Sequence, residues 1–273
     1  MKYACCNCKN ESLPGRDVTA ARLSAWALIL CVFLWIPPIH AHNPEDKPFS
    51  PGEKLVFIVT WSSMPVGQSV LEVMPNTSVN GLEAQHFVMT ARTNSFADIF
   101  YKVRDRMEGF TDKGMTRSLM YRKSGKGKSR RNVVVAFDWE ARMARYFNNG
   151  EKHASVKIMP GSFDPLSVFF AFRFSDLEIS KEIAIPVSDG KKTVTGRAIV
   201  LEREVIDVQG HYYDTFLVQV DMNDVDGVFK KSKDASLYIW VTADDRRIPV
   251  RIKSSVIVGS FNADLLSAEL SNK

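Results

Sequence analysis

The chain has 273 residues, of which 45% are hydrophobic, which is enough for one substantial core. Its formal net charge is +5, and residues 42–273 alone carry +3, because the first 41 residues hold four basic and two acidic side chains. So mild a positive excess does not indicate a nucleic-acid partner.

The start of the chain has the pattern of an export signal. Residues 25–36 are apolar and uncharged, Arg16 and Arg22 precede them, and Ala41 follows. A relaxed helix needs about 20 residues to span a bilayer, so this run predicts a secretory signal peptide over residues 1–41, cleaved after Ala41. An uncleaved membrane anchor is the alternative.

All four cysteines lie inside this leader, at Cys5, Cys6, Cys8 and Cys31. A structural zinc site needs four ligands, and no later cysteine supplies the second pair. Residues 42–273 are therefore expected to form no disulfide and to depend on their core for stability.

Short strands separated by turn signals follow a polar lead-in segment, residues 42–52. Asn80-Gly81 and Asn149-Gly150 are hairpin signals, and residues 95–102 are expected to form one helical turn. Apolar residues on both faces of 53–61 predict a central strand. In the first half of the chain, strands are predicted at 53–61, up to 74, 85–93, 103–111, 117–122, 130–139 and 151–159.

The clearest predicted helix is rich in phenylalanine. Asp164 is a candidate N-cap, Pro165 fits the first helical position, and residues 166–174 follow. Its phenylalanines point to more than one side, so the helix must be broadly covered or offer an apolar face. Beyond it, strands are predicted at 182–187, 192–205, 212–220, 237–242, 247–258 and 261–270.

About ten to twelve short strands at steady spacing, with one substantial helix, predict a mainly β fold. The expected architecture is an antiparallel meander that forms a barrel or a curved half-barrel, in a single domain over residues 53–271. Strands do not alternate with helices, which argues against a parallel α/β fold.

Several motifs follow one another in a fixed order. They are Pro51-Gly52-Glu53-Lys54-Leu55; Val103-Arg104-Asp105-Arg106; Phe163-Asp164-Pro165-Leu166-Ser167 with Arg173; Ile239-Trp240-Val241-Thr242; and residues 244–250, followed by Gly259. In this order, over residues 49–270, the chain resembles the bacterial domain-of-unknown-function 3108 family. The resemblance implies an exported β-rich protein, in the periplasm or associated with the envelope of a Gram-negative-type bacterium. It implies no established activity and no catalytic residues.

Aromatic side chains are the first candidates for a binding site. They could line a cavity for an apolar or lipid-like ligand, with the phenylalanine-rich helix as plug or lid. A packed core would use the same residues, and that alternative stays open. The candidates are Phe57, Trp61, Phe137, Trp139, Phe169, Phe170 and Trp240.

A basic hairpin is the second candidate. It could contact an anionic component of the envelope, such as lipid headgroups. A solvated hairpin whose charge discourages edge pairing is the alternative. Its cations are Arg122, Lys123, Lys126, Lys128, Arg130 and Arg131.

Other motifs fail on inspection. Residues 221–227 resemble a calcium loop, but Met222 and Lys233 would occupy ligand positions. Residues 127–129 match the end of a phosphate-binding loop without its earlier glycine. Asp164 and Ser167 are better explained as helix capping than as a site. The sequence therefore predicts no catalytic residue, metal or cofactor.

Three functional hypotheses remain. The leading one is a non-enzymatic binder of a lipid-like or apolar ligand. The second is a structural or assembly factor of the cell envelope that acts through surface contacts. A hydrolase with a spatially assembled site is third, since the mature histidines are scattered singly and no nucleophile elbow is present.

Overall fold

The computed structural model describes residues 47–126, 130–221, 236–256 and 259–271. They belong to one compact unit, Lys47–Lys273. The predicted signal peptide and all four cysteines lie outside the described residues. No helix in the described ranges is both long enough and apolar enough to cross a membrane.

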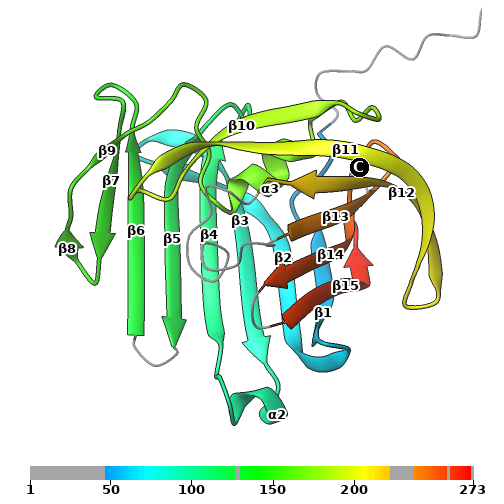
Figure 1. Ribbon diagram of the computed structural model, residues 1–273. Coiled ribbons are helices and arrows are strands. Elements are labelled where there is room, and N and C mark those ends of the chain that lie inside the picture. The colour runs from blue at the N-terminus through cyan, green and yellow to red at the C-terminus, as the bar shows by residue number, and fades with distance from the viewer. Residues whose placement is uncertain (1–46, 127–129, 222–235, 257–258, 272–273) are drawn as a thin grey trace, which may run out of the picture. The chain divides into compact units, whose positions relative to one another are not determined.

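Antiparallel strands make up most of the described chain (Figure 1). The elements are β1 Lys54–Trp61, β2 Met64–Val79, β3 Leu82–Thr93, α2 Ser95–Asp98, β4 Arg104–Asp112, β5 Ser118–Lys126, β6 Arg130–Asp138, β7 Met143–Asn148, β8 Glu151–Lys152, β9 Val156–Lys157, α3 Ser167–Phe172, β10 Glu182–Ser188, β11 Thr193–Val208, β12 His211–Val220, β13 Ser236–Thr242, β14 Pro249–Val256 and β15 Gly259–Glu269.

These strands form a single sheet. Its order is β10-β11-β12-β13-β14-β15-β1-β2-β3-β4-β5-β6-β7-β8, and β9 also pairs with β7. The mainly β, antiparallel meander that the sequence predicts is confirmed. Within the described residues the sheet remains open, since β10 and β8 end the order without pairing to each other.

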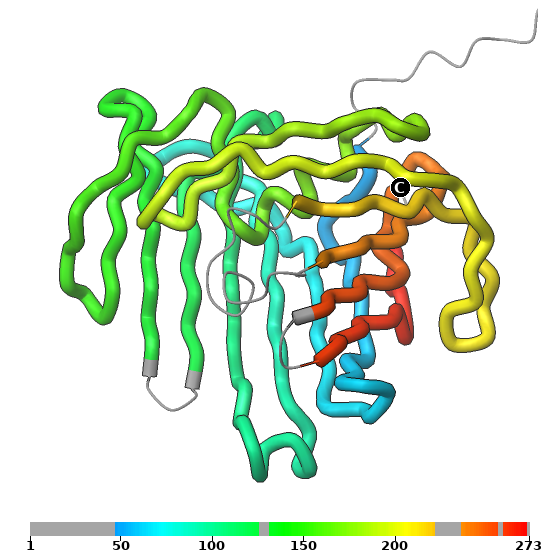
Figure 2. The backbone as a smooth tube through the Cα atoms, in the orientation of Figure 1, coloured from blue at the N-terminus to red at the C-terminus, as the bar shows by residue number. Residues whose placement is uncertain are grey.

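The first and last strands of the unit lie side by side in the middle of the sheet. β1 pairs with β15 on one side, with Phe57 opposite Leu265, and with β2 on the other. In Figure 2 the blue start of the unit accordingly runs beside its red end. The predicted central position of this strand is confirmed.

The hairpin signals locate real turns. Asn80 and Gly81 both have positive φ, 52° and 81°, and join β2 to β3 with Val79 opposite Leu82. A two-residue turn with two positive φ values matches the twist of the flanking strands, which is why Asn-Gly is favoured there.

The phenylalanine-rich helix is shorter than predicted. It has Leu166 as its N-cap and ends at Phe172, rather than running over 166–174 from Asp164. Asp164 still caps it in effect, since its Oδ1 accepts hydrogen bonds of 2.9 Å from the N–H groups of Leu166 and Ser167. Beyond Phe172 the N–H groups bond three residues back, which tightens the last turn and ends the α-helix.

The predicted strand at 151–159 is wrong as a continuous element. It is split into β8 and β9, each two residues long. Asn148 lies opposite Glu151, whereas Ala144 lies opposite Val156, so the register shifts by one residue between the two pieces. Such a bulge interrupts the ladder at the sheet edge.

Buried apolar side chains form three main clusters along the sheet. The first surrounds α3, where Phe87 and Phe170 are completely buried and their rings stack with centroids 3.9 Å apart. The second joins Leu55 and Phe57 of β1 to Leu265 of β15, and the third lies under β10–β13. Leu71 packs against both the first and the second cluster, which links them.

Candidate functional site

The space beneath α3 is filled by side chains. Leu166 and Phe170 project from the helix segment into the first cluster, and the ring of Phe49 packs edge-on against Phe87 and Phe170 with centroids 5.4 and 5.2 Å away. A small cleft near Phe49 and Glu53 has a volume of about 10 Å³, which is room for about one water molecule. In this conformation α3 acts as a plug rather than as a lid over a cavity.

The predicted aromatic lining residues do not come together in one place. Phe137 and Phe170 are buried in the cluster around α3, and Trp139 packs against it. Phe57 and Trp240 belong to the second cluster. Trp61 and Phe169 are partly exposed. Most of these side chains therefore contribute to the core, and a shared ligand cavity stays a prediction.

A buried ion pair holds α3 in place. The Arg173 guanidinium donates to both carboxylate oxygens of Glu53, at 2.5 and 3.0 Å, and both side chains are nearly inaccessible. It also donates to the carbonyl oxygens of Pro48 and Arg246, each at 2.8 Å. Three of the motifs that carry the family resemblance thus converge on one side chain.

Asp164 is a further buried ionisable group. The hydroxyl of Ser118 donates to its Oδ2 at 2.6 Å, and the backbone N–H of Asp164 donates back to that hydroxyl at 2.8 Å. Burial raises the pKa of the Asp164 carboxyl, and the hydrogen bond from Ser118 opposes this rise. A Cβ on Gly109 would lie 2.4 Å from Ser167 Oγ, so only glycine fits beside this hydroxyl. The capping role predicted for Asp164 is confirmed by its hydrogen bonds.

The β3–β4 connection lies at the end of the sheet where β1 and β3 finish (Figures 1 and 2). It carries a cluster of exposed apolar side chains. The connection between β3 and β4 contains α2, and it presents Ile99, Phe100 and Tyr101 with 76, 74 and 62% of their surface exposed. Phe96 on α2 is also exposed and packs edge-on against Phe100, with centroids 5.7 Å apart. Large apolar side chains exposed close together make this connection a candidate interaction site.

The β1–β2 hairpin lies beside this connection, and the ring of its Trp61 stacks on Phe261 of β15 with centroids 6.4 Å apart. Trp61 lies opposite Met64, and both are exposed. Asn94 joins this hairpin to the base of α2, because its Nδ2 donates to Pro65 O at 2.7 Å and its backbone N–H donates to Val66 O at 2.8 Å. We call Trp61, Met64, Phe96, Ile99, Phe100 and Tyr101 the apolar end.

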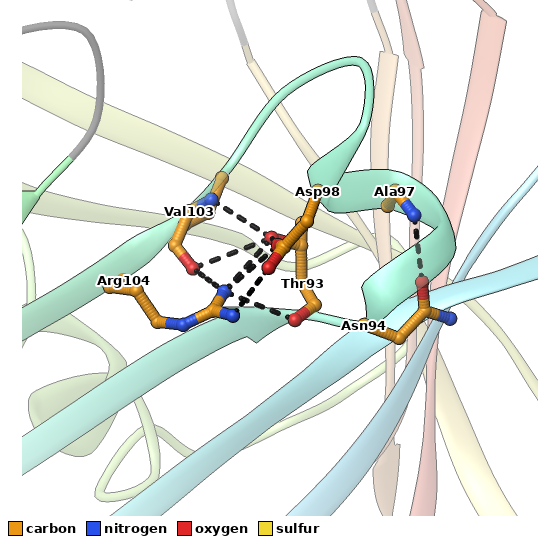
Figure 3. Close-up of polar contacts among 6 residues, drawn as sticks. All are labelled: Thr93, Asn94, Ala97, Asp98, Val103 and Arg104. Atoms are coloured by element: carbon orange, nitrogen blue, oxygen red, sulfur yellow. Dashed lines mark hydrogen bonds and ion pairs between the residues drawn. The ribbon is translucent and has the colours of Figure 1, made fainter.

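A polar network fixes the connection that carries the apolar end (Figure 3). Arg104 forms two hydrogen bonds with the Asp98 carboxylate, at 2.7 and 3.1 Å, and Thr93 Oγ1 donates to the same carboxylate. The N–H of Val103 donates to Thr93 Oγ1 at 2.9 Å. The hydrogen bonds from Arg104 and Thr93 hold the pKa of Asp98 below its usual value.

The backbone N–H groups of residues 97–101 are satisfied within this connection. Asn94 Oδ1 accepts from the N–H of Ala97 at 2.9 Å, and the N–H of Asp98 donates to Asn94 O. The N–H groups of Ile99, Phe100 and Tyr101 also bond to carbonyls within the turn. The N–H groups of these residues therefore do not oppose their transfer into an apolar medium.

The predicted basic hairpin is only partly described. Arg122 and Arg131 are exposed, and Lys123 Nζ lies 3.8 Å from Asp105 Oδ2. Arg122 lies over the ring of Phe110, 5.6 Å from its centroid. Lys126 and Arg130 end β5 and begin β6, but their side chains lie outside the described set, as does all of Lys128. The calcium-like and phosphate-loop-like segments also fall largely or wholly outside the described ranges.

The apolar end was not predicted from the sequence. The helical turn expected at residues 95–102 is confirmed by α2, but the apolar residues there had no predicted role. Phe96, Ile99 and Phe100 stand at i, i+3 and i+4 between two strands. One helical turn at a strand connection cannot bury three such side chains, so this spacing was the available signal.

The fold is an open antiparallel meander with a packed core, and one end of its sheet carries exposed apolar side chains. The chain belongs to DUF3108, a family of proteins of unknown function, whose sequence profile matches residues 56–266. This confirms the resemblance seen in the sequence. Among curated proteins, none matches the chain.

One solved structure supports the fold. A β-barrel-like protein of domain of unknown function 1849 from Brucella abortus superposes with a TM-score of 0.53 at 10% identity, over 82% of this chain and 100% of that chain. A provisionally named exported protein with a YmcC-like fold from Bacteroides fragilis gives 0.38 at 8% identity, over 82% and 98%. A provisionally named lipoprotein from Parabacteroides distasonis gives 0.32 at 10% identity, over 82% and 97%. The last two likenesses are too weak to support an argument.

Proposed function

We propose that this protein is a non-enzymatic binding protein of the bacterial envelope that takes a lipid-like or apolar partner. The partner binds on the outside of the molecule, at the apolar end, rather than in a cavity beneath α3. The observation that carries the proposal is the contrast between the two places. Phe170 of α3 is completely buried, whereas Ile99 and Phe100 at the apolar end are about three-quarters exposed.

Export is part of this proposal. The apolar run at residues 25–36, with Arg16 and Arg22 before it, supports delivery to the envelope. In that compartment lipid-like molecules are abundant, so exposed aromatic and aliphatic side chains have suitable partners. The second hypothesis, a structural or assembly factor, shares this use of the surface.

Photocrosslinking with a fatty acid that carries a diazirine on its chain tests the proposal. Cells that export the protein are fed the probe and irradiated, and the modified peptides are mapped by mass spectrometry. Crosslinks should fall within residues 61–64 and 95–101. Crosslinks within residues 163–174 would instead support a cavity beneath α3, and the absence of crosslinks would contradict lipid-like binding altogether.

A further inference from the structure

We propose that the apolar end is a docking surface for a phospholipid bilayer with anionic headgroups. Ile99, Phe100 and Phe96 would enter the boundary between headgroups and acyl chains, with Tyr101 at the level of the headgroups. This inference rests on the proposed function and names its partner. Four features of the described residues carry it.

The first feature is the order of apolar and basic residues along the sheet. Arg92 of β3 lies opposite Arg104 of β4. One residue further into the sheet, Asp105 of β4 lies opposite Gly125 of β5, and Gly125 lies opposite Arg131 of β6. The basic residues of β3, β4 and β6 therefore lie within about one residue of the same height along the sheet. Residues 95–103 project beyond that height. A bilayer has the matching order, since its anionic groups lie outside its apolar layer.

The second feature is the charge of the connection itself. Residues 92–106 contain four basic side chains (Arg92, Lys102, Arg104, Arg106) and two acidic ones (Asp98, Asp105), which leaves a net charge of +2. Asp98 is neutralised by Arg104, and Asp105 lies beside Lys123. Within the described chain, Arg92 and Lys102 are exposed and form no ion pair. They remain available to phosphate groups.

The third feature is the kind of side chain exposed. Tyrosine and tryptophan favour the interface of a bilayer because their rings are apolar and their polar atoms can stay hydrated. Tyr101 and Trp61 both belong to the apolar end. The more exposed Ile99 and Phe100 supply the purely apolar side chains, and their N–H groups are already bonded.

The fourth feature argues against a second copy of this chain as the occupant. Two copies joined through their apolar ends would bring two sets of basic residues together, and like charges at an interface reduce association. An anionic bilayer meets the same residues with the opposite charge. Charge complementarity therefore favours the membrane.

Vesicle co-sedimentation tests this inference. The protein is used as it is purified from cells that export it. The probes are vesicles of phosphatidylcholine alone and of phosphatidylcholine mixed with phosphatidylglycerol. The wild-type protein should bind the mixed vesicles more tightly. Ile99→Ser combined with Phe100→Ser should weaken binding to both by about tenfold or more, because the inserted apolar area is lost. Arg92→Gln combined with Lys102→Gln should weaken binding to the mixed vesicles by about tenfold and leave binding to phosphatidylcholine unchanged.

Tyr212→Ser is the matched control, since Tyr212 is 78% exposed on the β11–β12 hairpin. It should bind both vesicle types like the wild type. The inference would be overturned if the wild-type protein bound both vesicle types equally. It would also be overturned if Tyr212→Ser lost as much vesicle binding as the Ile99 and Phe100 double variant. A third contradicting result would be an Ile99 and Phe100 double variant that no longer self-associates but still binds vesicles like the wild type. If fatty-acid crosslinks at 95–101 persist while phosphatidylglycerol has no effect, the proposed function stands and only this inference fails.

Discussion

Arg173 connects four separate stretches of chain through one side chain. It bonds to Glu53 in the β1 approach, to Pro48 in the lead-in segment and to Arg246 before β14, while its own backbone ends α3. A planar guanidinium with five N–H groups can serve all these acceptors at once, whereas a lysine ammonium offers a single point charge. The plug position of α3 therefore depends on this residue.

Arg173→Met should lower the free energy of unfolding by about 3–5 kcal/mol, because Glu53 is left as a buried, unpaired charge. Urea unfolding followed by circular dichroism measures the loss. Arg203→Met is the control, since the Arg203–Asp214 pair is about half exposed and should cost no more than about 1 kcal/mol. Replacing both partners, with Glu53→Leu and Arg173→Met, should recover part of the stability. Equal losses for the buried and the exposed pair would contradict this role.

At the scale of elements, the connection around α2 shows how a short turn can hold apolar residues away from the core. The helix has only four residues, too few to be stable alone. Its order comes from Asn94 at the N-cap and from the bonds of Asp98 to Thr93 and Arg104. The presentation of Ile99 and Phe100 thus depends on polar residues that never contact a lipid.

Asn94→Ala should remove about 1 kcal/mol of local stability, because its side chain no longer accepts from the N–H of Ala97 or donates to Pro65 O. Amide hydrogen exchange at residues 97–101 should become about fivefold faster, while exchange at the centre of β3 stays the same. Asn76→Ala is a suitable comparison, since Asn76 donates only to the exposed Glu83 side chain. Unchanged exchange in Asn94→Ala would show that the turn is held by other contacts.

At the scale of the whole molecule, local features were predictable and distant ones were not. Alternating apolar residues and Asn-Gly turns are local signals, and they placed most strands of the meander correctly. The pairing of β1 with β15 and the Glu53–Arg173 bond, which spans 120 residues, have no local signature. The same limit explains the candidate site, since apolar spacing of i, i+3 and i+4 looks alike in the buried α3 and the exposed α2 connection.

The pairing of the first strand with the last should make residues 47–273 unfold as one cooperative unit. Leu265 of β15 lies opposite Phe57 and is buried in the second cluster, so Leu265→Ala should cost about 2–5 kcal/mol. Trp139 packs on the first cluster and Trp240 on the second, so each reports on a different part of the sheet. The unfolding midpoint should shift by the same amount whichever of them is used as the fluorescent probe. Fluorescence of variants that keep one of these tryptophans measures both.

Leu266→Ala is the matched control, because the neighbouring Leu266 side chain is 47% exposed and its loss should change stability by only about 0.5 kcal/mol. A midpoint that moves for Trp240 but not for Trp139 would mean that the two ends of the sheet unfold separately.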